Sequence, residues 1–476
     1  MRQRWRELGN LVLLPALVVM QVFDLRRAVV GPGWVYSSYL IGFSLVVIVG
    51  LPMVWPALRR IPRPLWIILA AFAALLAYAA VTVWVSGPET WPIHQRTYAE
   101  GKPLPPGVRP EQWDHRVVPL LTALVTMLAA VVVVLLVQAR RRAWVMWWAA
   151  WVLLVTSLLG WPRAMAAHDS PRLASGMGGS AVLHVVFLLV LGLFLGAAAQ
   201  GLRRWWSLAG AAVALGCVLL TGSRAGLVTL AVFAVLVLVW VGGRVSLKWS
   251  LLALAALVAV GAVLVAVAPF LRRLLNGGDQ LRQENLTTGW QLFTSDWTHT
   301  VFGVGSGKLW PWYAYDARLL RPPYRGRVQT AEGIVQTNPH SVPLAVGVEL
   351  GLVGLVLLAL IVIVLVVSLI RARRAVVGLG GVADGLRLAV VASLAAFAFD
   401  HYLFKNFGIS FWWWVCLATV FLLPGPGDGD SSGGDSSGDG ACGDDSSGDG
   451  ASDDGASDEG MSDEGTQMPA VQSVAL

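Results

Sequence analysis

Charged residues are scarce in this chain. Asp, Glu, Lys and Arg make up 13% of its 476 residues, and hydrophobic residues make up 56%. A soluble domain carries about 25% charged residues, so this composition excludes an ordinary soluble protein. Uninterrupted apolar runs such as 117–137 reach the ~20 residues that cross a bilayer as a helix. A membrane β-barrel would show short alternating segments instead. The sequence therefore predicts an all-α, polytopic membrane protein.

Cysteine is also rare, with three residues in the whole chain. Cys217 and Cys416 lie in apolar runs and Cys442 lies in an acidic tail, so no disulfide framework is predicted. Histidine and cysteine show no metal-ligand spacing. The acids and histidines of 87–116 are scattered and interrupted by Pro and Gly. We therefore expect no metal and no cofactor.

Basic residues are missing from one segment. Residues 428–464 carry 13 acids and no Lys or Arg, which leaves 35 basic against 15 acidic residues elsewhere. The Gly-, Ser- and Asp-rich segment 424–476 cannot bury a core, so we expect a disordered, solvated tail. Elsewhere the basic residues cluster at the ends of apolar runs. This pattern reports membrane topology and gives no reason to expect a nucleic-acid partner.

The apolar runs predict about twelve transmembrane helices. Basic clusters fall in alternate connections, which the positive-inside rule places in the cytoplasm together with both termini. The basic N-terminus resembles a signal sequence, but no small-residue cleavage site follows it, so we expect a retained first helix. The predicted spans are roughly 8–23, 34–54, 65–86, 117–137, 143–161, 181–199, 206–220, 225–241, 250–270, 344–370, 386–402 and 407–423.

These spans divide the chain into four regions. Residues 1–270 hold transmembrane helices one to nine, 271–343 form a large extracytoplasmic loop, 344–423 hold helices ten to twelve, and 424–476 form the cytoplasmic tail. Loops of this length usually carry function.

The long loop contains an aromatic stretch. Trp290, Phe293 and Trp297 recur at three- and four-residue spacing, which predicts a short helix over 287–300 lying along the membrane surface. The glycine-rich run 302–307 would end this helix. No parallel strand precedes that run, so we expect a flexible turn and no nucleotide site.

A titratable histidine stands at the end of this loop, in Asn338-Pro339-His340-Ser341. It lies at the outer lip of an apolar helix that Ser341 or Asn338 would cap. His340 is either a general base for an attacking hydroxyl or a helix-end residue bonded to a carbonyl. Glu349 lies about 13 Å deeper along the helix axis, so we expect it to anchor a neighbouring helix or an arginine.

Arginine marks a second candidate site. Arg224 follows Gly222 and Ser223 between two apolar runs, where a charge is costly unless it is paired. It either snorkels to the headgroups, caps a helix end or binds an anion, because a guanidinium suits phosphate oxygens. Among the loop's basic residues we favour Arg282 as a second anion ligand. The loop's basic residues are Arg272, Arg273, Arg282, Lys308, Arg318, Arg321, Arg325 and Arg327.

Three segments resemble the O-antigen ligase family. Thr221-Gly222-Ser223-Arg224-Ala225-Gly226 is similar to that family's Ser-Arg signature, and 291–305 is similar to its periplasmic helix and glycine turn. Pro339-His340-Ser341, followed by 349–355 (Glu-Leu-Gly-Leu-Val-Gly-Leu), resembles its Pro-His-Asn and Glu-Leu-Gly signatures. Here Ser341 replaces the usual Asn. The family's helix arginine would align with Leu286, and Arg282 lies one turn earlier.

The resemblance implies a metal-independent, inverting glycosyltransferase. Such enzymes move a glycan from undecaprenyl diphosphate to an acceptor hydroxyl on the outer face of the bacterial cytoplasmic membrane. His340 would be the base, Arg224 and Arg282 would hold the diphosphate, and Ser223, Asn338 and Glu349 would support them. A glycolipid, a glycan or a protein are all possible acceptors, so a polysaccharide polymerase and a protein O-oligosaccharyltransferase remain alternatives. A transporter is the unrelated alternative, but no repeat-related halves are visible.

Overall fold

The computed structural model describes residues 2–25, 35–87, 116–168, 171–241, 280–310, 327–329, 333–336, 338–375 and 381–423. The chain divides into two units, Met1–Gly425 and Pro426–Leu476, and the fold described here is that of the first. The predicted span 250–270 and the predicted acidic tail lie outside the described residues.

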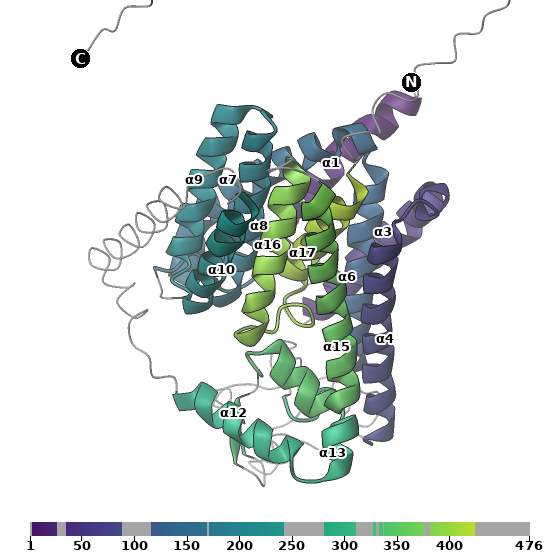
Figure 1. Ribbon diagram of the computed structural model, residues 1–476, viewed down its shortest axis with the longest axis vertical. Helices are drawn as coiled ribbons and strands as arrows, with labels where there is room; N and C mark the ends of the chain where they lie inside the picture. Colours follow the sequence, from purple (N-terminus) through teal and green to yellow (C-terminus); the bar gives the residue numbers. More distant parts are fainter. Residues whose placement is uncertain are drawn as a thin grey trace, which may run out of the picture. The chain divides into compact units, whose positions relative to one another are not determined.

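The described chain is almost wholly helical (Figure 1). One small antiparallel sheet pairs β1 (Arg327–Gln329) with β2 (Ile334–Gln336). The helices are α1 (Arg2–Val22), α3 (Val35–Leu58), α4 (Arg63–Val85), α6 (Val117–Leu136), η1 (Ala139–Arg141), α7 (Arg142–His168), α8 (Ser180–Ala199), α9 (Arg204–Leu220), α10 (Arg224–Val241), α12 (Gln280–Phe293), α13 (Trp297–Phe302), α15 (Val342–Ala375), α16 (Val382–Ser393), η3 (Leu394–Ala398) and α17 (Phe407–Leu422).

The helical membrane architecture predicted from the sequence is confirmed. Within the described residues, six helices are long and apolar enough to cross a bilayer, and four shorter apolar helices accompany them. Each predicted span other than 250–270 overlaps a described helix. The six long spans are Ser38–Leu58, Arg63–Val85, Val117–Leu136, Ala139–Pro162, Ser180–Ala199 and Val342–Ser368.

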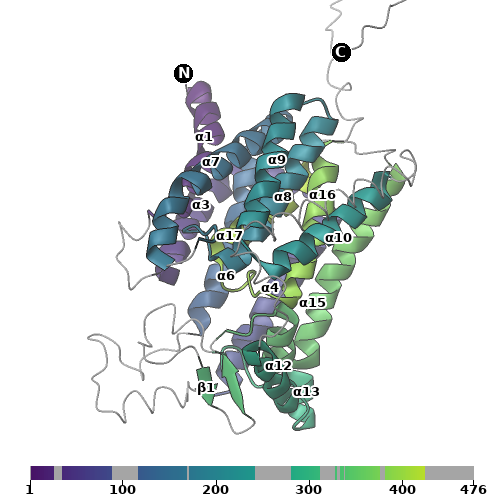
Figure 2. The same cartoon turned by 90° about the vertical axis from the view of Figure 1, so that its left-hand side faces the viewer.

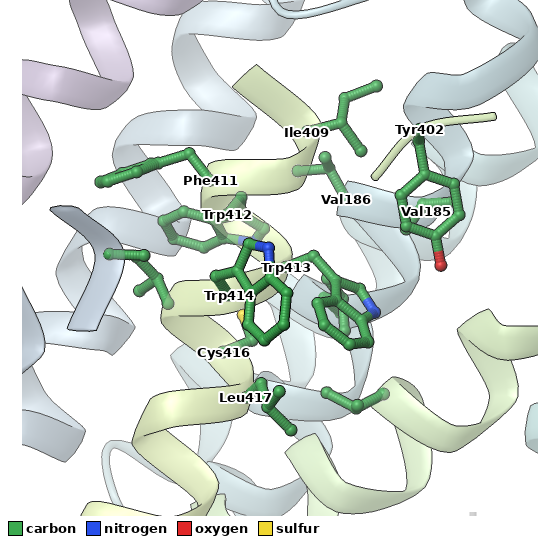
Figure 3. Close-up of a cluster of buried hydrophobic side chains, with 14 of the residues drawn as sticks. Val185, Val186, Tyr402, Ile409, Phe411, Trp412, Trp413, Trp414, Cys416 and Leu417 are labelled. Atoms are coloured by element: carbon green, nitrogen blue, oxygen red, sulfur yellow. The ribbon is translucent and has the colours of Figure 1, made fainter. Parts of the chain in front are cut away.

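The centre of the bundle is formed around α17, which is apolar on all sides. A helix of this kind is stable only when it is enclosed, and Trp412, Trp413 and Trp414 are each at most 1% exposed. Figure 3 shows these rings beside Val185 and Val186 of α8. The indole nitrogen of Trp413 donates to Ser393 Oγ at 2.9 Å. The aromatic core therefore ties α17 to the end of α16.

One end of the bundle carries the described part of the long loop 271–343. Helices α12 and α13 pack against α15, which also packs along α4, and β2 lies against α12 (Figure 2). The prediction of one helix over 287–300 is wrong. The chain breaks between Phe293 and Trp297, where Asp296 caps α13 by accepting from His299 N at 2.9 Å. A carboxylate at an N-cap satisfies a free backbone N–H, which favours a new helix start here.

Candidate functional site: an arginine-lined cavity beside His340

Three arginines from distant parts of the chain surround one cavity. Arg172 comes from the connection between α7 and α8, Arg224 begins α10, and Arg282 lies on α12. The empty volume is about 440 Å³. The structure thus brings together the two arginines selected from the sequence, although 58 positions separate them. The remaining lining residues are Ala181, Gly222, Ser223, Ala225 and Asp400.

The position of Arg224 is set by a tight turn between α9 and α10. Gly222 has a positive φ of 57°, a conformation that costs glycine little. Ser223 then caps α10 by accepting from Gly226 N at 3.3 Å, and its hydroxyl donates to the Ala181 carbonyl of α8 at 3.1 Å. Arg224 therefore stands in the first turn of a helix, where free N–H groups and the helix dipole also favour an anion.

Two lining residues have no counterpart in the sequence motifs. Arg172 is fixed by donating from Nε to the Thr221 carbonyl at 2.8 Å. Asp400 is 3% exposed and interacts electrostatically with Arg282 and Arg172. A buried carboxylate among arginines offsets part of their mutual repulsion. The cavity is rich in positive charge, because three guanidinium groups and one buried acid line it.

His340 occupies an uncommon backbone conformation next to α15. Its φ is 53°, in the left-handed region, which costs most non-glycine residues energy and recurs at functional sites. Asn338 Oδ1 accepts from His340 N at 3.3 Å, and Ser341 Oγ accepts from Leu344 N at 3.2 Å. The predicted cap at Ser341 is therefore present, and Asn338 supports the histidine backbone. His340 is half-buried.

Two consecutive residues after η3, Asp400 and His401, connect the arginine cavity with the surroundings of His340. Asp400 lines the arginine cavity, and His401 lies within electrostatic range of His340. Among the described residues, the lining of the arginine cavity does not include His340 itself. His401 instead lines a second, mostly apolar cavity of about 460 Å³ that also contains Glu349 and Arg116.

Glu349 anchors the glycine-rich turn of the long loop. Its two carboxylate oxygens accept from Gly307 N at 2.9 Å and Trp310 N at 3.2 Å. Glu349 thus holds backbone N–H groups of the loop, and it also interacts electrostatically with Arg116, in line with the expectation of an arginine partner. The turn expected at 302–307 is present after α13, and Glu349 accepts from one of its N–H groups. Carboxylates readily satisfy several backbone donors at once.

The same turn fits into a break in α15. Gly351 has φ 65° and ψ −163°, which is not helical. The carbonyls of Val348 and Glu349 are thereby available to Val304 N and Gly305 N, each at 3.0 Å. A Cβ at Gly351 would collide with the Val301 carbonyl. The Glu-Leu-Gly sequence 349–351 and the glycine-rich turn 302–307 therefore bind each other. We call this contact the interlock.

Lys308 attaches the far side of this turn to the end of α4, and Arg116, which precedes α6, binds the same end of α4. Lys308 Nζ donates to the Ser86 carbonyl at 2.6 Å, and Arg116 donates to Ser86 Oγ and to the Val83 carbonyl at 3.1 Å each. Cations suit the carbonyl end of a helix. Burial, followed by the nearby Arg116 charge, lowers the pKa of Lys308 from its ordinary value. The loop is therefore held on both α4 and α15.

Other candidates from the sequence lie outside this region. Arg272, Arg273, Arg318, Arg321 and Arg325 fall outside the described residues, as do the histidines of 87–116. Within the described ranges, no group of three or more His, Cys, Asp or Glu residues is arranged as a metal site.

The geometry defines a multi-pass membrane protein with a cavity lined by three arginines. Residues 209–359 match the family model described as O-antigen ligase, which supports an assignment to that family. The matched segment includes Arg224, Arg282, His340 and Glu349 but neither Arg172 nor Asp400. A search of curated proteins finds no match. The domain supports an O-antigen ligase-type or related polymerase function.

Proposed function

We propose that this protein transfers a glycan from undecaprenyl diphosphate to an acceptor hydroxyl. The strongest support is that one cavity is lined by Arg172, Arg224 and Arg282. A diphosphate carries two adjacent anionic groups, and guanidinium groups bind such oxygens in pairs. A lipid diphosphate is the anionic headgroup that this membrane setting suits best.

The arginines would act on the leaving group. Attack at the anomeric carbon breaks its bond to the diphosphate oxygen, and negative charge grows on that oxygen. Preorganised positive groups stabilise such charge; by analogy with the loss of one oxyanion donor, each is worth roughly 3–4 kcal/mol. Arg224 and Arg282 hold the diphosphate, and Arg172, which the sequence did not suggest, adds a third charge. Attack from the opposite side gives inversion at the carbon.

His340 is proposed as the base that removes the acceptor proton. General-base catalysis contributes about 10²–10⁴-fold. The left-handed backbone at His340 and its support by Asn338 are consistent with a side chain held in a required direction. The proton passes from the acceptor hydroxyl to the imidazole as the new glycosidic bond forms.

The site is proposed to face the extracytoplasmic side of the bacterial cytoplasmic membrane. The alternation of basic connections puts the loop that carries Arg282 and His340 on the side opposite the cytoplasmic clusters. Both termini would then be cytoplasmic. The lipid donor reaches the cavity from the outer leaflet.

The identity of the acceptor separates this proposal from its nearest alternatives. A polysaccharide polymerase uses the same donor with a glycan acceptor, and a protein O-oligosaccharyltransferase uses a protein hydroxyl. The matched domain is compatible with ligase and polymerase activity alike. Ligase-type transfer to a glycolipid is preferred here, and competition among the three acceptor classes decides the question.

The decisive experiment uses purified protein, a defined undecaprenyl-diphosphate glycan, a chelator and candidate acceptors. His340→Asn keeps a residue that tolerates the left-handed conformation but removes the base. We expect its turnover to fall by about 10²–10⁴-fold with the fold intact. His340→Ala should behave in the same way.

The control is His299→Asn, at a half-buried position on α13 outside both cavities. It should keep near-normal turnover and so exclude a general effect of altering loop histidines. Near-normal turnover of both His340 variants would reject the assignment of the base. Absence of transfer by the wild type to any acceptor, with the donor bound, would reject glycan transfer.

A further inference from the structure

Asn285 links the elements that carry the two proposed chemical functions. It lies on α12 three residues after Arg282, so the two side chains are about one helical turn apart. It is 2% exposed. We propose that Asn285 is a positioning residue that sets the place of His340 relative to the arginine cavity. This inference rests on the proposed function.

The asparagine side chain makes three hydrogen bonds to three different segments. Its Nδ2 donates to the Pro339 carbonyl at 3.0 Å, immediately before His340. Its Oδ1 accepts from Trp310 Nε1 at 2.8 Å and from Gln336 N at 3.2 Å. The side chain thus joins the glycine-rich turn, strand β2 and the histidine segment to α12.

The chemistry of this position requires an amide. A side chain that donates to one carbonyl while accepting from two N–H groups must carry both an N–H and a carbonyl oxygen. An aspartate accepts from Trp310 and Gln336 but opposes the Pro339 carbonyl with negative charge. Asparagine therefore supplies the donor and the acceptor that its three partners need. Of the three hydrogen bonds, the one to Pro339 lies nearest to His340 in the sequence.

The bond to Pro339 holds the residue before His340, and Asn338 Oδ1 accepts from His340 N. Because Arg282 is fixed to the same helix, a shift of Pro339 away from Asn285 changes the separation between base and diphosphate. Misplacement by about 1 Å costs on the order of 10²-fold in rate. The expected signature is a loss of kcat without a loss of donor binding.

The test compares Asn285→Asp with Trp310→Phe. The first removes the bond to Pro339, and the second keeps that bond and removes one indole N–H. We expect Asn285→Asp to lower kcat by on the order of 10²-fold with the donor KM unchanged. Trp310→Phe should stay within roughly tenfold of wild type, as for the loss of a single neutral hydrogen bond.

Two measurements separate positioning from folding. Binding of undecaprenyl diphosphate to the detergent-purified protein should be equal for wild type and Asn285→Asp. Asn285→Ser removes the reach to Pro339 without a buried charge, and it replaces the aspartate variant where that variant does not yield monodisperse protein. The serine variant should show the same loss of kcat with the donor KM retained.

The outcomes distinguish this inference from the proposed function. A wild-type kcat in both Asn285 variants overturns the positioning role, and so does an equal loss of donor binding and kcat. His340→Asn is measured in the same assay. Full turnover of that variant rejects His340 as base, whereas its inactivity beside a fully active Asn285→Ser rejects only the role of Asn285.

Discussion

Glu349 Oε2 accepts a hydrogen bond from Gly307 N at 2.9 Å, across 42 positions of sequence. The carboxylate belongs to a membrane-spanning helix and the glycine to the loop above it. Because Glu349 is buried, the partners it holds are shielded from water, and their loss would leave polar groups unsatisfied. This contact holds the glycine-rich turn against α15. The same loop carries Arg282 and leads to His340.

Replacing Glu349 with glutamine tests the interlock. The amide keeps one acceptor oxygen but presents N–H groups to a second backbone donor, so one hydrogen bond is replaced by a repulsive contact. We expect a destabilisation of about 1–3 kcal/mol, together with faster hydrogen exchange of residues 303–310. Thermal unfolding and exchange mass spectrometry in detergent provide the measurements. Glu284→Gln on α12 is the control, and equal behaviour of the two variants would contradict the anchoring role.

Alanine at Gly351 tests the break in α15. The combination of φ 65° and ψ −163° is almost restricted to glycine and costs another residue about 1–3 kcal/mol, and the added Cβ would also collide with the Val301 carbonyl. We expect a lower unfolding temperature and displacement of the glycine-rich turn. Gly347→Ala in the same helix is a matched control, since its Cβ would lie 3.4 Å from Leu355 Cδ1, an ordinary contact. An equal effect at both positions would show that the break is unimportant.

Features that depend on neighbouring residues in the sequence are predictable here, whereas contacts between distant segments are not. Long apolar runs predicted the helices because a bilayer imposes their length and composition. Arg224 and Arg282 were selected from charge beside apolar segments, and the structure places both on one cavity. The predicted roles of these arginines and of His340 stay predictions.

The residues that were missed depend on tertiary structure. Arg172 and Asp400 come from short connections with no recognisable motif, and only the fold brings them to the cavity. Asn285 is a neutral residue in a helix, and its three partners are between 25 and 54 positions away. The ionisable Asp400 within the predicted apolar span 386–402 is the sequence signal that could have pointed to a buried site.

Lysine substitutions test how the cavity holds its anion. Arg224→Lys and Arg282→Lys keep one positive charge but lose the paired guanidinium donors. We expect transfer rates to fall by about 10²–10³-fold, as on removal of one preorganised donor. Steady-state transfer at fixed ionic strength measures the effect, with Arg59→Lys at the exposed end of α3 as the control. Rates equal to wild type in both cavity variants would argue against a bidentate diphosphate contact.

The exposed aromatic residues of α12 and α13 predict contact with the membrane surface. Trp290 is 60% exposed and Trp297 is 71% exposed, although large aromatic rings gain free energy at the lipid interface. A spin label at position 290, in protein reconstituted in nanodiscs with Cys442→Ser, should be more accessible to oxygen than to a polar nickel chelate. A label at exposed Gln291, about 100° around the helix, should show the reverse. If the nickel chelate reaches position 290 as readily as position 291, then α12 lies in water. Arg282 would then lie away from the headgroups, where it must bind a lipid diphosphate.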